Sequence, residues 1–132
     1  MEEKMTASSI MTKEIIKIKP NATIGEAIKS CVDHKVGGLV VVNENEDAVG
    51  VLSEKDLLVA YDFLAETNST VAEFFSKELV SINEDTPILE IIRLLVQRNF
   101  KRVPVVRGKK VVGIVSRADI LRWIASTQIN KK

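Results

Sequence analysis

Two serine–aspartate pairs with identical spacing are the residues in this sequence best suited to chemistry. Ser53 and Asp56 follow a short apolar run, and Ser116 and Asp119 follow a matching one. In both places a β-branched stretch stops at a serine and a helical pattern begins, so we expect a strand-to-helix corner. The free backbone N–H groups of a helix start attract anions, and a carboxylate accepts hydrogen bonds from neutral hydroxyls. Each corner is therefore a candidate binding site.

The two corners lie at equivalent positions in the two copies of an internal repeat. Thr12 and Ser76 lie 64 residues apart, and Glu26 and Glu90 repeat this offset. After the turn at 43–47, the offset falls to 63, because the second copy has lost one residue there. Such fixed-period similarity is typical of a duplicated structural unit. We place the first repeat at 1–68, including an N-terminal turn and a linker, and the second at 69–132.

Each copy begins with a short helical turn, at 6–11 or 70–75, and then an extended segment, at 15–18 or 79–82. Thr70 and Glu73 have the spacing of a capping box. A helix follows in each copy, starting at Thr23 with Glu26 as its capping partner, and at Thr86 with Pro87 in the first helical position. The spacing of apolar residues predicts a buried helix face in each copy, formed by Ile24, Ala27, Ile28, Cys31 and Val32, and by Ile88, Ile91, Ile92, Leu95 and Val96.

The second half of each copy is predicted to be a hairpin and a closing helix. The strands are expected at 39–42 with 49–52 and at 103–106 with 111–115, and the helices at 54–65 and 117–127. The fold class is therefore mixed α/β (α+β), with two βαββα repeats. A unit of about 60 residues buries only about 60% of its unfolded surface. We therefore expect the repeats to pack around a pseudo-twofold axis, with a cleft that carries both corners.

Composition narrows the classes of function. A net charge of +1 gives no support for broad nucleic-acid binding. The apolar runs are too short to cross a bilayer, so no membrane partner is expected. One cysteine, Cys31, precludes an internal disulfide and suits the cytoplasm. With His34 as the single histidine, no metal site is expected, and His34 itself fits a surface or helix-end role.

These motifs, taken in order, resemble the cystathionine-β-synthase (CBS) domain family. The resemblance rests on Met11-Thr12, on the strand Arg102-Val103-Pro104-Val105-Val106, and on the Gly-hydrophobic-hydrophobic-Ser-x-x-Asp corners that end at Asp56 and Asp119. It covers the chain from about residue 6 to residue 124, and the whole looks like one stand-alone tandem CBS pair, also called a Bateman module.

The resemblance implies a sensor of adenosyl ligands, namely AMP, ADP, ATP or S-adenosylmethionine, with no catalytic residue, metal or cofactor. By position, Asp56 and Asp119 would accept hydrogen bonds from ribose hydroxyls, and Ser53 and Ser116 would lie near phosphates. The family pattern does not decide which copy's strands face which aspartate. The ligand-binding set that it implies is Thr12, Lys17, Val36, Gly37, Gly38, Ser53, Asp56, Ser76, Ser81, Phe100, Lys101, Arg102, Ile114, Ser116, Arg117 and Asp119.

Alternative readings of the same residues stay open. Ser-x-x-Asp before an apolar run is also an ordinary helix cap, in which the aspartate turns back to the serine. Arg102 and Arg117 are candidates to hold phosphate in the second copy, because a guanidinium forks onto phosphate oxygens. The basic turn at 107–110 is expected to be solvated, and the matching turn at 43–47 is acidic.

The sequence thus predicts a non-catalytic regulatory module that binds an adenosyl ligand between its repeats and signals to an unknown partner protein. The family resemblance also implies a homodimer formed through helical faces. The rival hypothesis is an interaction or dimerisation scaffold that binds no physiological small ligand and uses its aspartates only as caps.

Overall fold

The computed structural model describes residues 5–64, 68–75 and 79–129, and its chain forms two compact units. One unit is Ile15–Leu79, and the other combines Met1–Glu14 with Val80–Lys132. We call them the first-repeat unit and the second-repeat unit, because each contains the sheet and main helices of one repeat.

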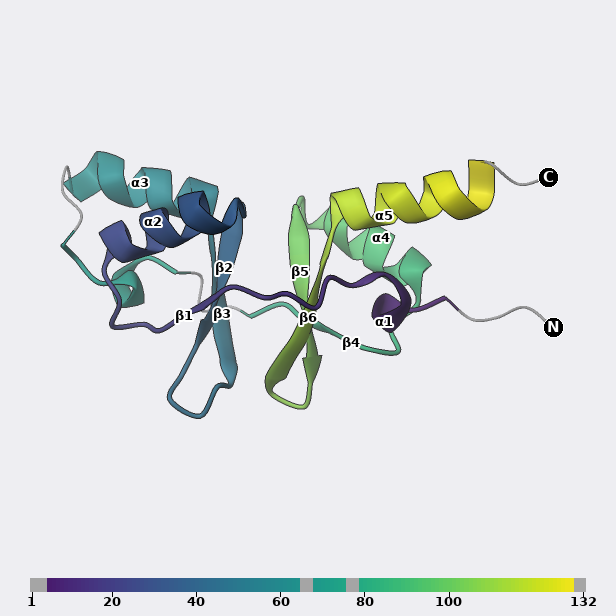
Figure 1. Cartoon of the computed structure of the whole chain (residues 1–132), viewed down its shortest axis with the longest axis horizontal. Helices are drawn as coiled ribbons and strands as arrows, with labels where there is room; N and C mark the ends of the chain where they lie inside the picture. The colour runs from purple at the N-terminus through teal and green to yellow at the C-terminus, as the bar shows by residue number, and fades with distance from the viewer. Residues whose placement is uncertain (1–4, 65–67, 76–78, 130–132) are drawn as a thin grey trace. The chain divides into compact units, whose positions relative to one another are not determined.

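The first-repeat unit has a three-stranded sheet in the order β1-β2-β3. Its strands are β1 (Lys17–Ile18), β2 (Gly38–Val42) and β3 (Ala48–Ser53). The helix α2 (Ile24–His34) connects the parallel strands β1 and β2, and a tight turn connects the antiparallel strands β2 and β3. The helix α3 (Glu54–Leu64) begins directly after β3 and packs beside α2 (Figure 1). A 3-10 turn, η1 (Val71–Glu73), completes the unit.

The second-repeat unit repeats this architecture with the order β4-β5-β6. It contains β4 (Ile82–Asn83), α4 (Ile88–Gln97), β5 (Arg102–Arg107), β6 (Lys110–Ser116) and α5 (Arg117–Ile124), followed by a π-helical segment, Ala125–Ile129. The mixed α/β fold with two three-stranded sheets agrees with the sequence prediction, as do the positions of the hairpins and closing helices. The first strand of each sheet is shorter than expected, with two residues in each case.

The short helical turns pack in a way that the repeat did not predict. The helix α1 (Ala7–Ile10) lies in the second-repeat unit, where the Ala7 amide donates to the Thr86 carbonyl at 2.9 Å. Conversely, η1 lies in the first-repeat unit, where the Val71 amide donates to the Ala22 carbonyl at 2.8 Å. Each turn thus belongs to the unit built mainly from the other sequence repeat. The repeat boundaries at 68 and 69 remain a prediction about the sequence.

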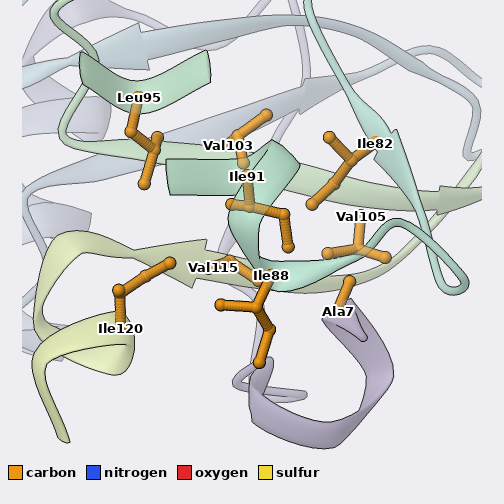
Figure 2. Close-up of a cluster of buried hydrophobic side chains, with 9 residues drawn as sticks. All are labelled: Ala7, Ile82, Ile88, Ile91, Leu95, Val103, Val105, Val115 and Ile120. Atoms are coloured by element: carbon orange, nitrogen blue, oxygen red, sulfur yellow. The ribbon is translucent and has the colours of Figure 1, made fainter. Parts of the chain in front are cut away.

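Each unit has its own hydrophobic core beneath its two main helices. Figure 2 shows the core of the second-repeat unit, in which side chains of α4 pack against residues of the sheet and against Ala7 of α1. The equivalent residues of α2, among them Ile24, Ala27 and Cys31, are buried in the first-repeat unit. The prediction that the buried faces extend to Val32 and Val96 was wrong, because these side chains are 69% and 70% exposed. Both lie near the C-terminal end of their helix, and the core is filled there by Cys31 and Leu95.

The helix starts also follow the sequence only in part. Thr23 and Glu26 form the predicted capping box, in which the Glu26 amide donates to Thr23 Oγ1 at 3.0 Å. Pro87 is the N-cap of α4 rather than its first helical residue. The Thr70 side chain makes no capping hydrogen bond to η1, so the capping box predicted there does not form. A single 3-10 turn presents fewer free N–H groups than an α-helix. Backbone hydrogen bonds from Val71 to Ala22 and from Ala72 to Pro20 hold this turn instead.

Candidate functional site

The α5 corner combines the end of β6 with the start of α5. The Ser116 amide and hydroxyl both donate to Asp119 Oδ2, at 2.8 and 3.0 Å. In return, the Asp119 amide donates to Ser116 Oγ at 3.2 Å. This reciprocal arrangement is a capping box, so the capping interpretation of Ser-x-x-Asp is confirmed for one carboxylate oxygen.

The second oxygen of Asp119 also has partners. Thr12 Oγ1 donates to Asp119 Oδ1 at 3.3 Å, and Arg122 Nη2 donates to the same oxygen at 2.6 Å. Asp119 is only 6% exposed, and it is the one charged side chain found buried among the described residues. A buried carboxylate must be hydrogen-bonded or paired, and these four donors satisfy it.

Thr12 reaches this carboxylate because its segment extends the sheet. The Thr12 amide donates to the Ile114 carbonyl at 2.8 Å, and the Ile114 amide donates back to the Thr12 carbonyl at 2.9 Å. Met11 lies against Gly113, where a Cβ atom would come within 2.5 Å of the Met11 sulfur. The segment around Thr12, which precedes β1, therefore lies beside Asp119 of the second repeat. The sequence had not decided which segment would lie beside this aspartate.

The α3 corner has the same internal geometry. The Ser53 amide and hydroxyl donate to Asp56 Oδ2 at 2.8 and 2.9 Å, and the Asp56 amide donates to Ser53 Oγ at 3.1 Å. Asp56 is only partly buried. Within the described ranges, no hydrogen bond reaches its other oxygen, Oδ1. One oxygen of this aspartate thus stays available as an acceptor.

The loop before β5 contains Phe100 and Lys101, and the other two basic residues predicted for this corner begin α5 and β5. The Arg117 guanidinium donates to the Phe100 carbonyl at 2.8 Å and to Asn99 Oδ1 at 3.1 Å, and the Arg117 amide donates to the Lys101 carbonyl at 3.0 Å. Arg117 thus holds this loop onto the start of α5. A guanidinium has five N–H donors, so these two bonds leave others for an anion. Arg102 begins β5 and is paired in register with Ser116.

Two hollows lie near other predicted residues. One, of about 260 Å³, is lined by Val36, Gly37 and Glu54, close to Asp56 at the start of α3, together with Cys31, Val32 and Lys35. The other, of about 550 Å³, lies in the second-repeat unit and includes Ser81. Neither hollow is lined by Asp56 or Asp119 themselves. The first hollow therefore adjoins the start of α3, the helix that contains Asp56.

The remaining predicted residues have other surroundings. Lys17 projects from β1 and pairs with Glu46 at 3.4 Å, away from either aspartate's hydrogen bonds. Gly38 starts β2 opposite Ser53, and so lies at the α3 corner. Ser76 lies outside the described residues. The structure thus gathers Gly38, Ser53 and Asp56 at one corner, and it gathers Thr12, Phe100, Lys101, Arg102, Ile114, Ser116, Arg117 and Asp119 at the other.

Arg122 was missed by the sequence reasoning, although it bonds Asp119 directly. The signal was its position three residues after Asp119, since residues at this spacing meet on one helix face. The equivalent residue of the first repeat is Val59, which has no donor group.

Other expectations concern groups away from the corners. Cys31 is a buried cysteine outside any disulfide, and His34 is exposed at the end of α2, with Nδ1 2.9 Å from the Ser30 carbonyl. No cluster of three potential metal-ligating side chains occurs in the part of the chain that the structure describes. Within those same residues, every helix is too short or too polar to span a bilayer.

Comparison with known proteins gives the same picture over nearly the whole chain. The family model for the CBS domain matches residues 7–62 and again residues 71–126. An uncharacterised 17.7 kDa protein of Acidianus ambivalens is 31% identical over 116 residues, which is 87% of this chain and 70% of that protein. The chain spans between 31% and 70% of the length of this and three further curated relatives.

Several similar solved structures carry adenosyl ligands. The CBS domain pair of protein MJ0100, in complex with 5′-methylthioadenosine and S-adenosyl-L-methionine, has a TM-score of 0.85 and 26% identity, covering 96% of this chain and all of that one. CBSX2 in complex with AMP has a TM-score of 0.81 and 28% identity, covering 96% and 98%. The duplicated fold, the two serine–aspartate corners and these matches together show that the chain belongs to the CBS domain family and contains two CBS domains in tandem.

Proposed function

We propose that this chain is a non-catalytic regulatory module that binds an adenosyl ligand at its strand-to-helix corners and signals its occupancy to a partner protein. The observation that carries the proposal is the Ser–Asp corner, present in both units with the same hydrogen bonds. Similar CBS pairs were solved with AMP or with S-adenosyl-L-methionine, and they match this chain over 96% of its length.

The chemistry of each corner suits an adenosyl ligand. The carboxylate can accept a hydrogen bond from a ribose hydroxyl. Because the hydroxyl is neutral, no charged group of the ligand has to lose its hydration to make this bond. In the second-repeat unit, Arg117 and the start of α5 offer N–H groups for a phosphate. In the first-repeat unit, the open hollow at Val36 and Gly37 adjoins the start of α3. We propose AMP, ADP, ATP and S-adenosylmethionine as the ligands to test.

The test is thermal unfolding of the purified chain with each of these ligands and with guanosine nucleotides as controls. A ligand present at 100 times its dissociation constant should add about 2.7 kcal/mol to the free energy of unfolding. Titration calorimetry of Asp56→Asn and Asp119→Asn then locates the site. A hydrogen bond to a charged group contributes roughly 1.5–3 kcal/mol, so loss of the carboxylate that holds ligand should weaken binding about tenfold to a hundredfold.

A second candidate is an interaction scaffold without a small ligand. It is favoured by the capping boxes, because both aspartates already have a structural role. Exposed apolar side chains on the helices, among them Val32, Leu58 and Val96, also suit a protein interface. The absence of any thermal shift with all adenosyl ligands at several millimolar would support this scaffold and contradict the sensor.

The partner is proposed to include a second copy of the chain. The same exposed helical residues would be covered in a homodimer formed through helical faces, and sedimentation of the ligand-free and ligand-bound protein measures this. A ligand can shift such an assembly only if it binds two arrangements with different affinity. With Cys31 as its single cysteine, the chain forms no internal disulfide, which is consistent with the cytoplasmic location that we also propose.

A further inference from the structure

Arg122 distinguishes the two aspartates that the proposed function treats as equivalent. Its Nη2 donates to Asp119 Oδ1 at 2.6 Å, while Thr12 Oγ1 donates to the same oxygen at 3.3 Å. The Ser116 amide and hydroxyl fill the other oxygen. An ionised carboxylate has about four lone-pair positions, so the acceptor capacity of Asp119 is fully used.

Asp56 lacks this arginine. The residue three positions later is Val59, whose side chain cannot donate a hydrogen bond. The Ser53 amide and hydroxyl fill Asp56 Oδ2, and no donor from the described residues reaches Oδ1. An incoming hydroxyl can therefore bond Asp56 directly, whereas at Asp119 it must first displace a donor of the chain itself.

The geometry of Arg122 allows such a displacement. Its side chain is 70% exposed, although its partner carboxylate is 6% exposed. Side chains at this spacing share a helix face, and a long exposed arginine retains much rotational freedom. The arginine can therefore swing into solvent without disturbing the core, and its Coulomb attraction to Asp119 is what a ligand must overcome.

We propose that Arg122 is a built-in competitor for the ligand at Asp119, and that it makes the α5 corner the weaker of the two ribose sites. This inference rests on the proposed function, because it assumes that each aspartate accepts a ribose hydroxyl. It adds an order of filling: an adenosyl ligand occupies the α3 corner first and the α5 corner only at higher concentration. A single exposed side chain thus gives one module two ligand thresholds.

The experiment uses adenosine, since a ligand without phosphate has no anion for a released arginine to bind. In the Asp56→Asn background only the α5 corner retains its carboxylate, and calorimetry compares Arg122 with Arg122→Val, the residue that the first repeat has. We expect adenosine to bind Arg122→Val about 1.5-fold to fivefold more tightly, the range for one exposed ion pair. Arg93→Val, which removes an exposed arginine of α4, is the matched control and should leave affinity unchanged.

The reciprocal experiment installs the arginine where it is absent. In the Asp119→Asn background, Val59→Arg should weaken adenosine binding by a similar factor. Leu58→Arg adds the same charge to a neighbouring exposed position of α3 that does not face Asp56, and it should have little effect. Circular dichroism and thermal melting of each variant establish that both units remain folded.

NMR spectroscopy can observe the Arg122–Asp119 ion pair directly during an adenosine titration. In the wild-type chain, NMR signals of the Ser53 amide should shift at lower adenosine concentration than those of the Ser116 amide, and the Arg122 guanidinium signal should change together with Ser116. If Arg122→Val binds adenosine more weakly than the chain with Arg122, then Arg122 contacts the ligand. If the two bind equally, Arg122 does not compete with the ligand. Either result overturns the inference and leaves the proposed function intact. If folded wild-type and variant chains all fail to bind adenosine or any adenosyl nucleotide, both proposals are contradicted.

Discussion

At the α3 corner, Ser53 is the only residue of the described chain that donates hydrogen bonds to the Asp56 carboxylate. At the α5 corner, Thr12 and Arg122 donate to Asp119 in addition to Ser116. The serine–aspartate geometry is nearly identical, with Ser N to Asp Oδ2 distances of 2.8 Å in both units. The shared motif therefore fixes one carboxylate oxygen. What surrounds the motif decides whether the other oxygen is available to a ligand.

The hairpin turns differ in a similar way. In the first-repeat unit, the acidic Glu46 is held by Lys17 and Lys19. In the second-repeat unit, the basic Arg107 is held by Glu84, with two parallel hydrogen bonds of 2.8 and 2.9 Å. Both units tie the hairpin turn to the segment that contains their first strand, but the charges are reversed. Both repeats thus keep an ion pair between the hairpin turn and the segment of the first strand, although the acidic and basic residues have exchanged places.

The largest expected effect concerns the two cores. Leu95 and Cys31 occupy equivalent buried positions on α4 and α2. Leu95→Ala should lower the free energy of unfolding by about 2–5 kcal/mol, because it leaves a cavity in the core. Cys31→Ala removes a single heavy atom and should cost roughly 1 kcal/mol, the scale of one buried methylene. Urea unfolding measures both, with the exposed Leu89→Ala as the control for α4. Equal costs for the two substitutions would contradict this difference between the cores.

A medium effect is expected at the caps. Ser116→Ala and Ser53→Ala each remove a hydroxyl that accepts from the amide of an aspartate and donates to its carboxylate. Loss of such a cap typically costs about 0.5–2 kcal/mol. The larger cost should fall on Ser116→Ala, since water reaches the partly exposed Asp56 more easily than the buried Asp119. Thermal unfolding of both variants measures the difference, and a larger cost for Ser53→Ala would reverse the comparison.

The smallest effect concerns pH. The hydrogen bond from the Arg107 guanidinium lowers the pKa of Glu84 below its ordinary 4.5, and hydrogen bonding and charge from Lys19, then Lys17, lower the pKa of Glu46. A carboxyl whose pKa is lower in the folded state stabilises the fold above its unfolded pKa. This contribution is lost as the pH falls through the folded pKa.

Substituting the partners separates the two turns. Arg107→Gln should return most of the Glu84 pKa shift, because Arg107 is its main cause and Lys13 adds a smaller one. Lys19→Gln, in contrast, should leave part of the Glu46 shift to Lys17. Carbon-detected NMR titration of the glutamate carboxyl groups measures both. A full return of the Glu46 pKa in Lys19→Gln would show that Lys17 contributes nothing.

The sequence by itself determined the repeat, the order of strands and helices, and the capping box at Thr23, and it offered the caps at Ser53 and Ser116 as one of two interpretations. These features are local: the serine and aspartate of a cap lie three residues apart, and any helix that starts there brings them together. Apolar spacing also identified most of the buried faces of α2 and α4. Family resemblance then indicated the chemistry for which the corners are suited.

Only the tertiary structure decided which distant segments meet. Thr12 joins Asp119 across 107 residues because its segment pairs with Ile114 of β6, and nothing in the local sequence specifies that partner. The exposure of Val32 and Val96 likewise depends on where each core ends. The availability of the two aspartates was settled in the same way. Hydrogen bonds within one helical turn follow from the backbone, whereas contacts between distant segments depend on how the whole unit packs.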